Sequence, residues 1–188
     1  MRITDNYVFF WKDWLSNYQK TKFCPNQDEA PLMYFTSTEQ AFMFEKAMYF
    51  KDYETAKSIV HCDNPDQCRK FGRMVKGYDD KKWDKVRYEV FYKYNLMKYT
   101  QDKKLQKMLL DPKFDGKVFV EASPIDRIWG IGISEDVDNI EDLEYKWGRN
   151  LLGKIITNIR NRIKQNKIYD SNWNIYDYWG NGDETDLI

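Results

Sequence analysis

The sequence predicts a single, mainly helical α+β domain. Its 188 residues, 42% of them hydrophobic, allow one compact domain with a core. Several segments carry helix-start signals or apolar side chains at three- and four-residue spacing, whereas only two short segments have the β-branched and aromatic content of strands. We expect a helical body over residues 1–166 with a few short strands, followed by an acidic, aromatic tail over residues 167–188.

The composition places this domain in a broad class without naming a partner. The 30 basic and 30 acidic side chains balance, and 17% of the residues are aromatic, which excludes a disordered chain and a polycationic nucleic-acid coat. No signal peptide or long apolar run is present, so we expect a soluble, cytoplasmic protein with no membrane partner. Three widely spaced cysteines are typical of reduced thiols.

The first half of the chain contains one strand and two helix starts. A short strand is expected within the aromatic residues 8–19, followed by a loop. Ser37 and Gln40 have the spacing of a capping box, which predicts a helix beginning at Ser37. Asn64 followed by Pro65 predicts a second helix, extending to about Lys76.

The second half is expected to be mostly helical. Apolar side chains recur at helical spacing from Asp80 to about Lys98, which predicts one long helix. A shorter helix around residues 105–109 precedes a strand at residues 117–123 and a glycine-containing loop at 126–134. A final helix carries a buried stripe made by Leu151, Leu152, Ile155, Ile156, Ile159 and Ile163.

The first cluster with chemical potential is Glu39 with Lys46. Seven residues apart on one helix, the two share a face and lie roughly 10 Å apart along its axis, so both could reach one ligand. The alternative is a capping glutamate and a surface lysine. The apolar neighbours of these residues favour a buried helix, in which a charged side chain needs a reason.

The second cluster surrounds a strand end. Glu121 and Asp126 leave the predicted strand for a glycine-containing loop, with Arg127 and Trp129 beside them. Two carboxyl groups at such a point could supply an acid, a base or ribose contacts, and the tryptophan a stacking surface. The alternative is an ordinary strand end with a structural tryptophan.

The third cluster precedes the last helix. Trp147, Gly148, Arg149 and Asn150 combine a helix start, expected to have free amides, with an arginine and a glycine that permits close approach. This arrangement could bind phosphate. The alternative is a plain Asn150 helix cap. We expect no metal site and no cofactor, because His61 and the cysteines lack metal-ligand spacing and no dinucleotide or P-loop motif occurs.

Taken in order, these motifs resemble the YbiA-like family, also called NADAR for NAD- and ADP-ribose-associated proteins. The resemblance covers roughly residues 7–165, departing at Tyr18, where phenylalanine is usual, and at an acidic insertion at 135–144 that is expected to flank the site. The matching segments are LSNY at 15–18, STEQAFMFEKA at 37–47, FGR at 71–73, Trp83, VEASPIDRIWGIG at 120–132 and WGRNLLGK at 147–154.

The resemblance implies a compact, mainly helical fold with a few short strands, and an N-glycosidase that cleaves a bond between ribose and an amine. The resemblance implies that the active site includes Glu39, Lys46, Trp83, Asp126 and Trp129. Glu39 and Asp126 could protonate the leaving amine and stabilise the ribose cation, or Lys46 could form a Schiff base with the opened ribose. Predicted catalytic residues are Glu39, Lys46 and Asp126; predicted substrate-binding residues are Asn17, Arg73, Trp83, Glu121, Arg127, Trp129, Gly130, Trp147, Asn150 and Lys154.

The implied substrate is ADP-ribose attached to guanine in nucleic acid, which would make an ADP-ribosyltransferase toxin a candidate partner. Alternatives are a ribosylaminopyrimidine phosphate of riboflavin biosynthesis and a module that binds ADP-ribose or NAD without turnover. The carboxyl groups argue against the module, because binding an anionic ligand does not require them. A nucleic-acid-associated structural protein ranks last, because basic and acidic residues are interspersed.

Overall fold

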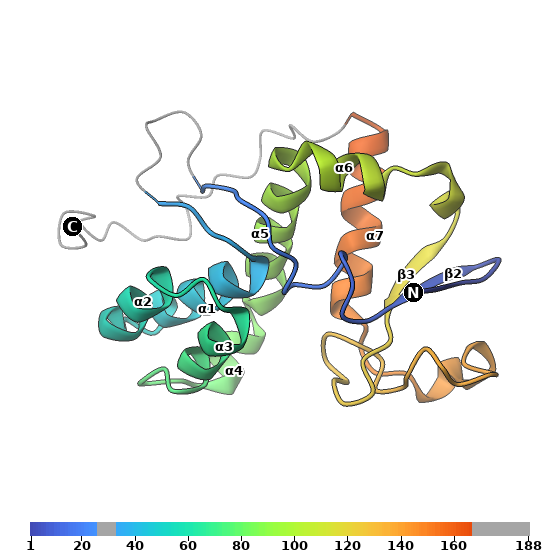
Figure 1. Cartoon of the computed structure of the whole chain (residues 1–188). Helices are drawn as coiled ribbons and strands as arrows, with labels where there is room; N and C mark the ends of the chain where they lie inside the picture. The colour runs from blue at the N-terminus through green and yellow to red at the C-terminus, as the bar shows by residue number, and fades with distance from the viewer. Residues whose placement is uncertain (26–32, 167–188) are drawn as a thin grey trace.

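The computed structural model describes residues 1–25 and 33–166, so the predicted tail lies outside the described residues. Figure 1 shows helix α5 (Arg87–Gln101) between a group of helices and a small sheet covered by helix α7 (Leu151–Lys164). The mainly helical α+β prediction is confirmed. The helices of the first group are α1 (Thr38–Tyr49), α2 (Tyr53–Val60), α3 (Pro65–Arg73) and α4 (Asp80–Asp84).

The sheet has three short strands in the order β1 (Arg2–Ile3), β2 (Tyr7–Phe10) and β3 (Val118–Glu121). β1 and β2 are antiparallel, whereas β2 and β3 are parallel with Phe10 opposite Glu121. The apolar stripe of α7 packs against β3, and α6 (Lys103–Leu109) joins the region of α5 to that of β3. Both predicted strands exist, and their parallel pairing places Glu121 beside the segment that follows β2.

Capping side chains begin the helices where the sequence indicates. Ser37 Oγ accepts from the amide of Gln40 at 3.1 Å at the start of α1, and Asn64 Oδ1 accepts from Gln67 at 3.2 Å at the start of α3. Helix α3 ends at Arg73, not at Lys76 as predicted. The reason is that the Lys76 amide donates to Asp52 Oδ2 at 2.8 Å and not to a carbonyl of the preceding helical turn.

The predicted long helix from Asp80 to Lys98 is wrong, because α4 ends at Asp84 and α5 begins at Arg87. The amide of Val86 bonds to the carbonyl of Trp83, three residues earlier, which closes a tight turn. Arg87 then folds back to pair with Asp80 and Asp84. The sequence reading also missed β1, helix α2, and the short 3-10 helices η1 (Pro112–Phe114) and η2 (Glu141–Lys146).

No helix within residues 1–25 and 33–166 is long and apolar enough to span a membrane.

Candidate active site

A cleft of about 1070 Å³ opens between the two halves of the fold. One wall is the segment of residues 11–20 that follows β2. The other walls are the first half of α1, one side of α3, and the chain from Glu121, the last residue of β3, to Trp129. Glu39, Glu121 and Asp126 all line this cleft, and Asp13 and Asp66 line it as well. Glu39 of the first predicted cluster therefore lies in the same cleft as Glu121 and Asp126 of the second, although the two segments are far apart in the sequence.

Glu39 lies in the first turn of α1 with only 6% of its surface exposed. The free amides of a helix start favour an ionised carboxylate. Burial nevertheless raises the pKa of Glu39 to about 7, with Asp126 and Asp66 acting in the same direction and Arg69 and Arg73 against it. Glu39 therefore holds a proton over much of the neutral range, as a general acid must.

Glu121 is the second carboxyl group with a proton at neutral pH. Burial raises its pKa to about 8, and the nearby charges of Asp126 and Glu39 add to the shift. Its Oε2 atom is buried and has no hydrogen-bond partner among the described residues. An unpaired buried oxygen is costly when charged, which favours the protonated form of Glu121.

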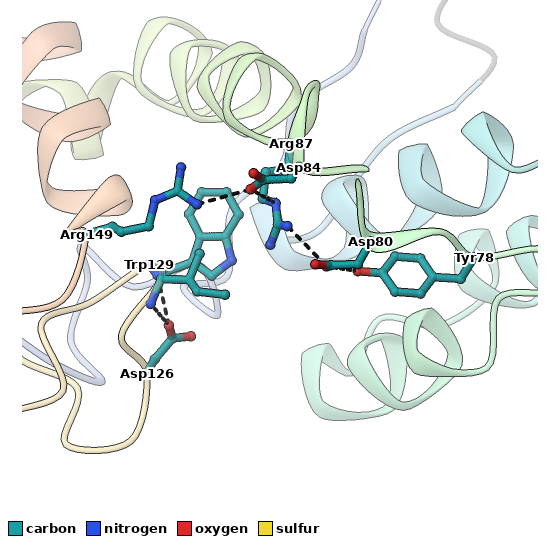
Figure 2. A network of polar contacts seen from close by, with 8 residues as sticks. Tyr78, Asp80, Asp84, Arg87, Asp126, Trp129 and Arg149 are labelled. Carbon is teal, nitrogen blue, oxygen red and sulfur yellow. Dashed lines mark hydrogen bonds and ion pairs between the residues drawn. The ribbon is translucent and has the colours of Figure 1, made fainter. Parts of the chain in front are cut away.

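Asp126 is oriented by the backbone of its own loop. Its Oδ1 accepts from the amides of Ile128 and Trp129, both at 2.8 Å. Figure 2 shows the Asp126 carboxyl group beside the backbone of Trp129. Its own amide donates to Ser123 Oγ at 3.2 Å. One carboxylate oxygen is thus fixed by two amide donors.

The loop that carries Asp126 and Trp129 is held by the chain that enters α7. The amides of residues 148–152 donate to carbonyls of residues 127–131, at distances between 2.8 and 3.2 Å. Gly148 is required at this contact, because a Cβ there would lie 2.4 Å from the carbonyl oxygen of Arg127. The expectation that these amides are free to bind phosphate is therefore wrong.

The family model of the NADAR domain matches residues 9–164. The chain belongs to the NADAR family. A protein of Acanthamoeba polyphaga mimivirus named as an N-glycosidase is 38% identical over 133 residues, which are 70% of this chain and 76% of the viral protein. The protein irg-1 of Caenorhabditis elegans is 33% identical over 144 residues, which are 75% of this chain and 66% of the relative.

The solved structures agree on the fold. The NMR structure of the Escherichia coli protein YbiA superposes with a TM-score of 0.67 at 21% identity, covering 89% of this chain and 90% of YbiA. The expected resemblance to the YbiA-like, or NADAR, family is thus confirmed.

Within this NADAR domain, Trp129 and Trp83 have different surroundings. Trp129 lines the cleft, and its ring lies 5.2 Å from that of Phe42 and 4.3 Å from that of Phe91. Trp83 is buried with 3% exposure and packs 5.3 Å from Phe42, outside the cleft. Trp129 is therefore placed to stack on a ligand, whereas Trp83 supports the aromatic wall from behind.

Lys46 is on the same face of α1 as Glu39, as predicted, but it does not line the cleft. Its Nζ donates to the carbonyl of Gly72 at 2.8 Å and lies 3.9 Å from the centre of the Tyr78 ring. Met43 lies between the two positions along the helix and lines the cleft. Burial, followed by the charge of Arg87, lowers the pKa of Lys46.

The third cluster serves the structure rather than the cleft. The Asn150 side chain does not cap α7. Its Oδ1 accepts from the backbone amide of Glu121 at 3.0 Å, and its Nδ2 donates to the carbonyl of Phe119 at 3.1 Å. The Trp147 ring packs against Tyr7 and Phe9. Figure 2 shows Arg149 paired with Asp84 in a chain of polar contacts that reaches Tyr78.

Only some of the predicted site residues line the cleft. Those that do are Asn17, Glu39, Glu121, Asp126 and Trp129, together with residues that were not predicted. The acidic insertion at 135–144 was expected to flank the site; none of its residues lines the cleft, and Arg2 of β1 binds its backbone at residues 135, 137 and 138. The predicted binding residues that do not line the cleft are Arg73, Trp83, Arg127, Gly130, Trp147, Asn150 and Lys154.

The sequence reading missed the basic side of the cleft. Arg69 on α3 lines the cleft and acts electrostatically on Glu39, Glu121 and Tyr18. The Tyr18 hydroxyl is buried; burial raises its pKa, and a hydrogen bond from Arg69 acts in the opposite direction. The signal for Arg69 was its position one helical turn before Arg73, on the helix predicted from Asn64.

Proposed function

We propose that the chain is an N-glycosidase that hydrolyses the bond between ribose and a nucleobase amine. The observation that carries this proposal is the meeting of Glu39, Glu121 and Asp126 in one cleft, with two of these carboxyl groups protonated near neutral pH. The similarity to the mimivirus protein named as an N-glycosidase supports the same activity.

The chemistry divides between the carboxyl groups. When the bond between the ribose C1 atom and nitrogen breaks, its electron pair leaves with the nitrogen, and positive charge develops on C1 and the ring oxygen. The fixed carboxylate of Asp126 stabilises that charge, and the protonated Glu39 gives its proton to the leaving nitrogen. Water adds its oxygen to C1 and returns a proton to the carboxylate of Glu39, so the acid is restored.

Direct attack of water agrees better with this geometry than a Schiff base on Lys46. The Lys46 amine is occupied by the carbonyl of Gly72 and the ring of Tyr78. It would have to leave both partners and pass Met43 to reach a ribose beside Glu39.

We propose ADP-ribosylated guanine in nucleic acid as the substrate. A cleft of about 1070 Å³ is at the upper end of small-molecule sites, which suits an ADP-ribose joined to a base better than a ribosylaminopyrimidine phosphate. Trp129 offers a stacking face, and Arg69 offers a cation for the diphosphate. The residues at 11–20 add further aromatic and basic lining, namely Trp11, Trp14, Lys12 and Lys20.

Parallel mass spectrometry of two reactions tests the substrate class. The wild-type chain is incubated with a guanine-ADP-ribosylated oligonucleotide and, separately, with ribosylaminopyrimidine phosphate. We expect release of ADP-ribose from the oligonucleotide at a rate about tenfold or more above cleavage of the pyrimidine, because only the larger ligand fills the cleft.

The reverse preference would assign the site to the small metabolite. Cleavage of neither substrate, together with a raised melting temperature in ADP-ribose, would contradict hydrolysis and favour a binding module.

A further inference from the structure

Lys98 is a completely buried lysine that the proposed chemistry does not use. It lies near the C-terminal end of α5, with 0% of its surface exposed. Its Nζ faces three consecutive carbonyl oxygens, at 3.4 Å from Trp14, 3.5 Å from Leu15 and 3.0 Å from Ser16. Burying an ammonium group is unfavourable, so its presence in the core needs a compensating role.

The three carbonyls belong to the segment of residues 11–20 that forms one wall of the cleft. At residues 14–16 they face the buried Lys98 amine, where unpaired acceptors would be costly; the carbonyl of Ser16 also accepts from the amide of Gln19 at 3.1 Å. The protonated amine has three N–H donors, which matches the three acceptors, and the neutral amine keeps two. Further along the chain from this wall, Cys24 is bonded to Gln101, the last residue of α5, and Thr21 is bonded to Asp102, which follows it.

The segment held by Lys98 also contacts the start of α1. The carbonyl of Asn17, which directly follows the three carbonyls bound by Lys98, accepts from the amide of Glu39 at 3.1 Å. The same carbonyl accepts from Thr38 Oγ1 at 3.2 Å. Two sets of hydrogen bonds, joined by the backbone of residues 14–17, therefore connect Lys98 to the backbone of Glu39.

We propose that Lys98 is a positioning residue for the cleft: it holds the carbonyls of residues 14–16 and so keeps this wall closed over Glu39. The connection above carries the proposal, and only its activity readout rests on the proposed function. Loss of the Lys98 ammonium group would release the wall and admit water to Glu39.

The charged groups around the two residues define what a titration reports. Lys98 is faced by Asp13 from the cleft wall and by Asp102, the residue between α5 and α6, and burial lowers its pKa to about 7. Glu39 is faced by Asp126 from the loop and by three charged residues of α3, which are Asp66, Arg69 and Arg73. Because burial is the largest cause of the raised pKa of Glu39, the pKa reports whether the wall is closed.

The test replaces Lys98 with methionine, which keeps the length of the side chain and removes its donors. The matched control is Lys93→Met, because Lys93 is also a buried lysine of α5 but lies 3.6 Å from Glu45 Oε2. Two readouts need no substrate: hydrogen exchange of the Glu39 amide, and NMR titration of the Glu39 carboxyl. The third is kcat/KM at pH 7 on the substrate that the wild type cleaves.

In Lys98→Met we expect exchange of the Glu39 amide about tenfold or more faster. The pKa of Glu39 should fall from about 7 toward 4.5, and kcat/KM should fall by about tenfold or more, because the acid loses its proton and its position. Lys93→Met should lower the melting temperature and leave the Glu39 pKa and its amide exchange as in the wild type.

Wild-type exchange and an unchanged Glu39 pKa in Lys98→Met would overturn the proposal, as would equal changes in both lysine variants. If Lys98→Met does not fold, Lys98→Gln is measured instead: with two N–H donors on a shorter, uncharged side chain it should change both substrate-free readouts in the same direction by a smaller amount, and wild-type values of both would overturn the proposal. If the wild type cleaves neither substrate while Lys98→Met still lowers the Glu39 pKa, the proposed function fails and the positioning role stands.

Discussion

Glu39→Gln should abolish hydrolysis while making the folded protein more stable at pH 8. The amide keeps the shape of the side chain but cannot give a proton to the leaving nitrogen, so kcat should fall by about 10²–10⁴-fold. Single-turnover mass spectrometry of the cleaved substrate measures this loss. Hydrolysis at the wild-type rate would contradict the role of Glu39.

The sign of the stability change follows from the raised pKa. Between about pH 4.5 and pH 7 the folded state holds a proton on Glu39 that the unfolded state has lost, so stability falls as pH rises through this range. Above pH 7 the buried charge costs up to about 3 kcal/mol at 1.36 kcal/mol per pKa unit. Glu39→Gln should therefore raise the melting temperature at pH 8 and change it little at pH 4.5.

Glu45→Gln is the matched control on the same helix. Glu45 is also buried, but the Tyr94 hydroxyl donates to its Oε2 and Lys93 lies 3.6 Å from the same oxygen. Removing this charge should cost about 1–3 kcal/mol, because a buried lysine loses its partner. The folded Glu45→Gln variant should keep its activity, which is the opposite pattern to Glu39→Gln. A melting temperature lowered equally by both variants would contradict the electrostatic account of Glu39.

Asp126 has a structural and an electrostatic role that two substitutions separate. In Asp126→Asn the side-chain oxygen still accepts from the amides of Ile128 and Trp129, but the negative charge is lost. We expect kcat to fall by about 10²–10³-fold, with the melting temperature close to that of the wild type. Asp126→Ala also removes the acceptor, so its melting temperature should fall as well.

Steady-state kinetics and calorimetry on the two variants check this prediction. An active Asp126→Asn with an inactive Asp126→Ala would show that the residue only shapes the loop.

The sequence predicted the elements whose signals are local. Ser37 and Asn64 cap their helices through contacts three residues away, so their positions follow from spacing alone. The break between α4 and α5 was not predictable in this way, because apolar spacing continues across it. It depends on the tight turn at Val86 and on Arg87 folding back to Asp80 and Asp84.

The same distinction applies to the site. The motif order indicated Glu39 and Asp126, which the structure places in one cleft. The spacing of Glu39 and Lys46 correctly predicted one helix face, but not that Gly72 and Tyr78, from the chain beyond α2, would engage the lysine. Likewise, the amides before α7 looked free in the sequence because their acceptors at residues 127–131 are joined to them only by folding.

The most direct test of the account is the pH dependence of the single-turnover rate, between pH 5 and pH 10, on whichever of the two substrates the wild-type chain cleaves. If a protonated carboxyl group in the cleft gives its proton to the leaving amine, the rate should fall as pH rises through about 7 to 8, where Glu39 and Glu121 lose their protons. A rate that rises through this range, or hydrolysis of neither substrate at any pH, would contradict it.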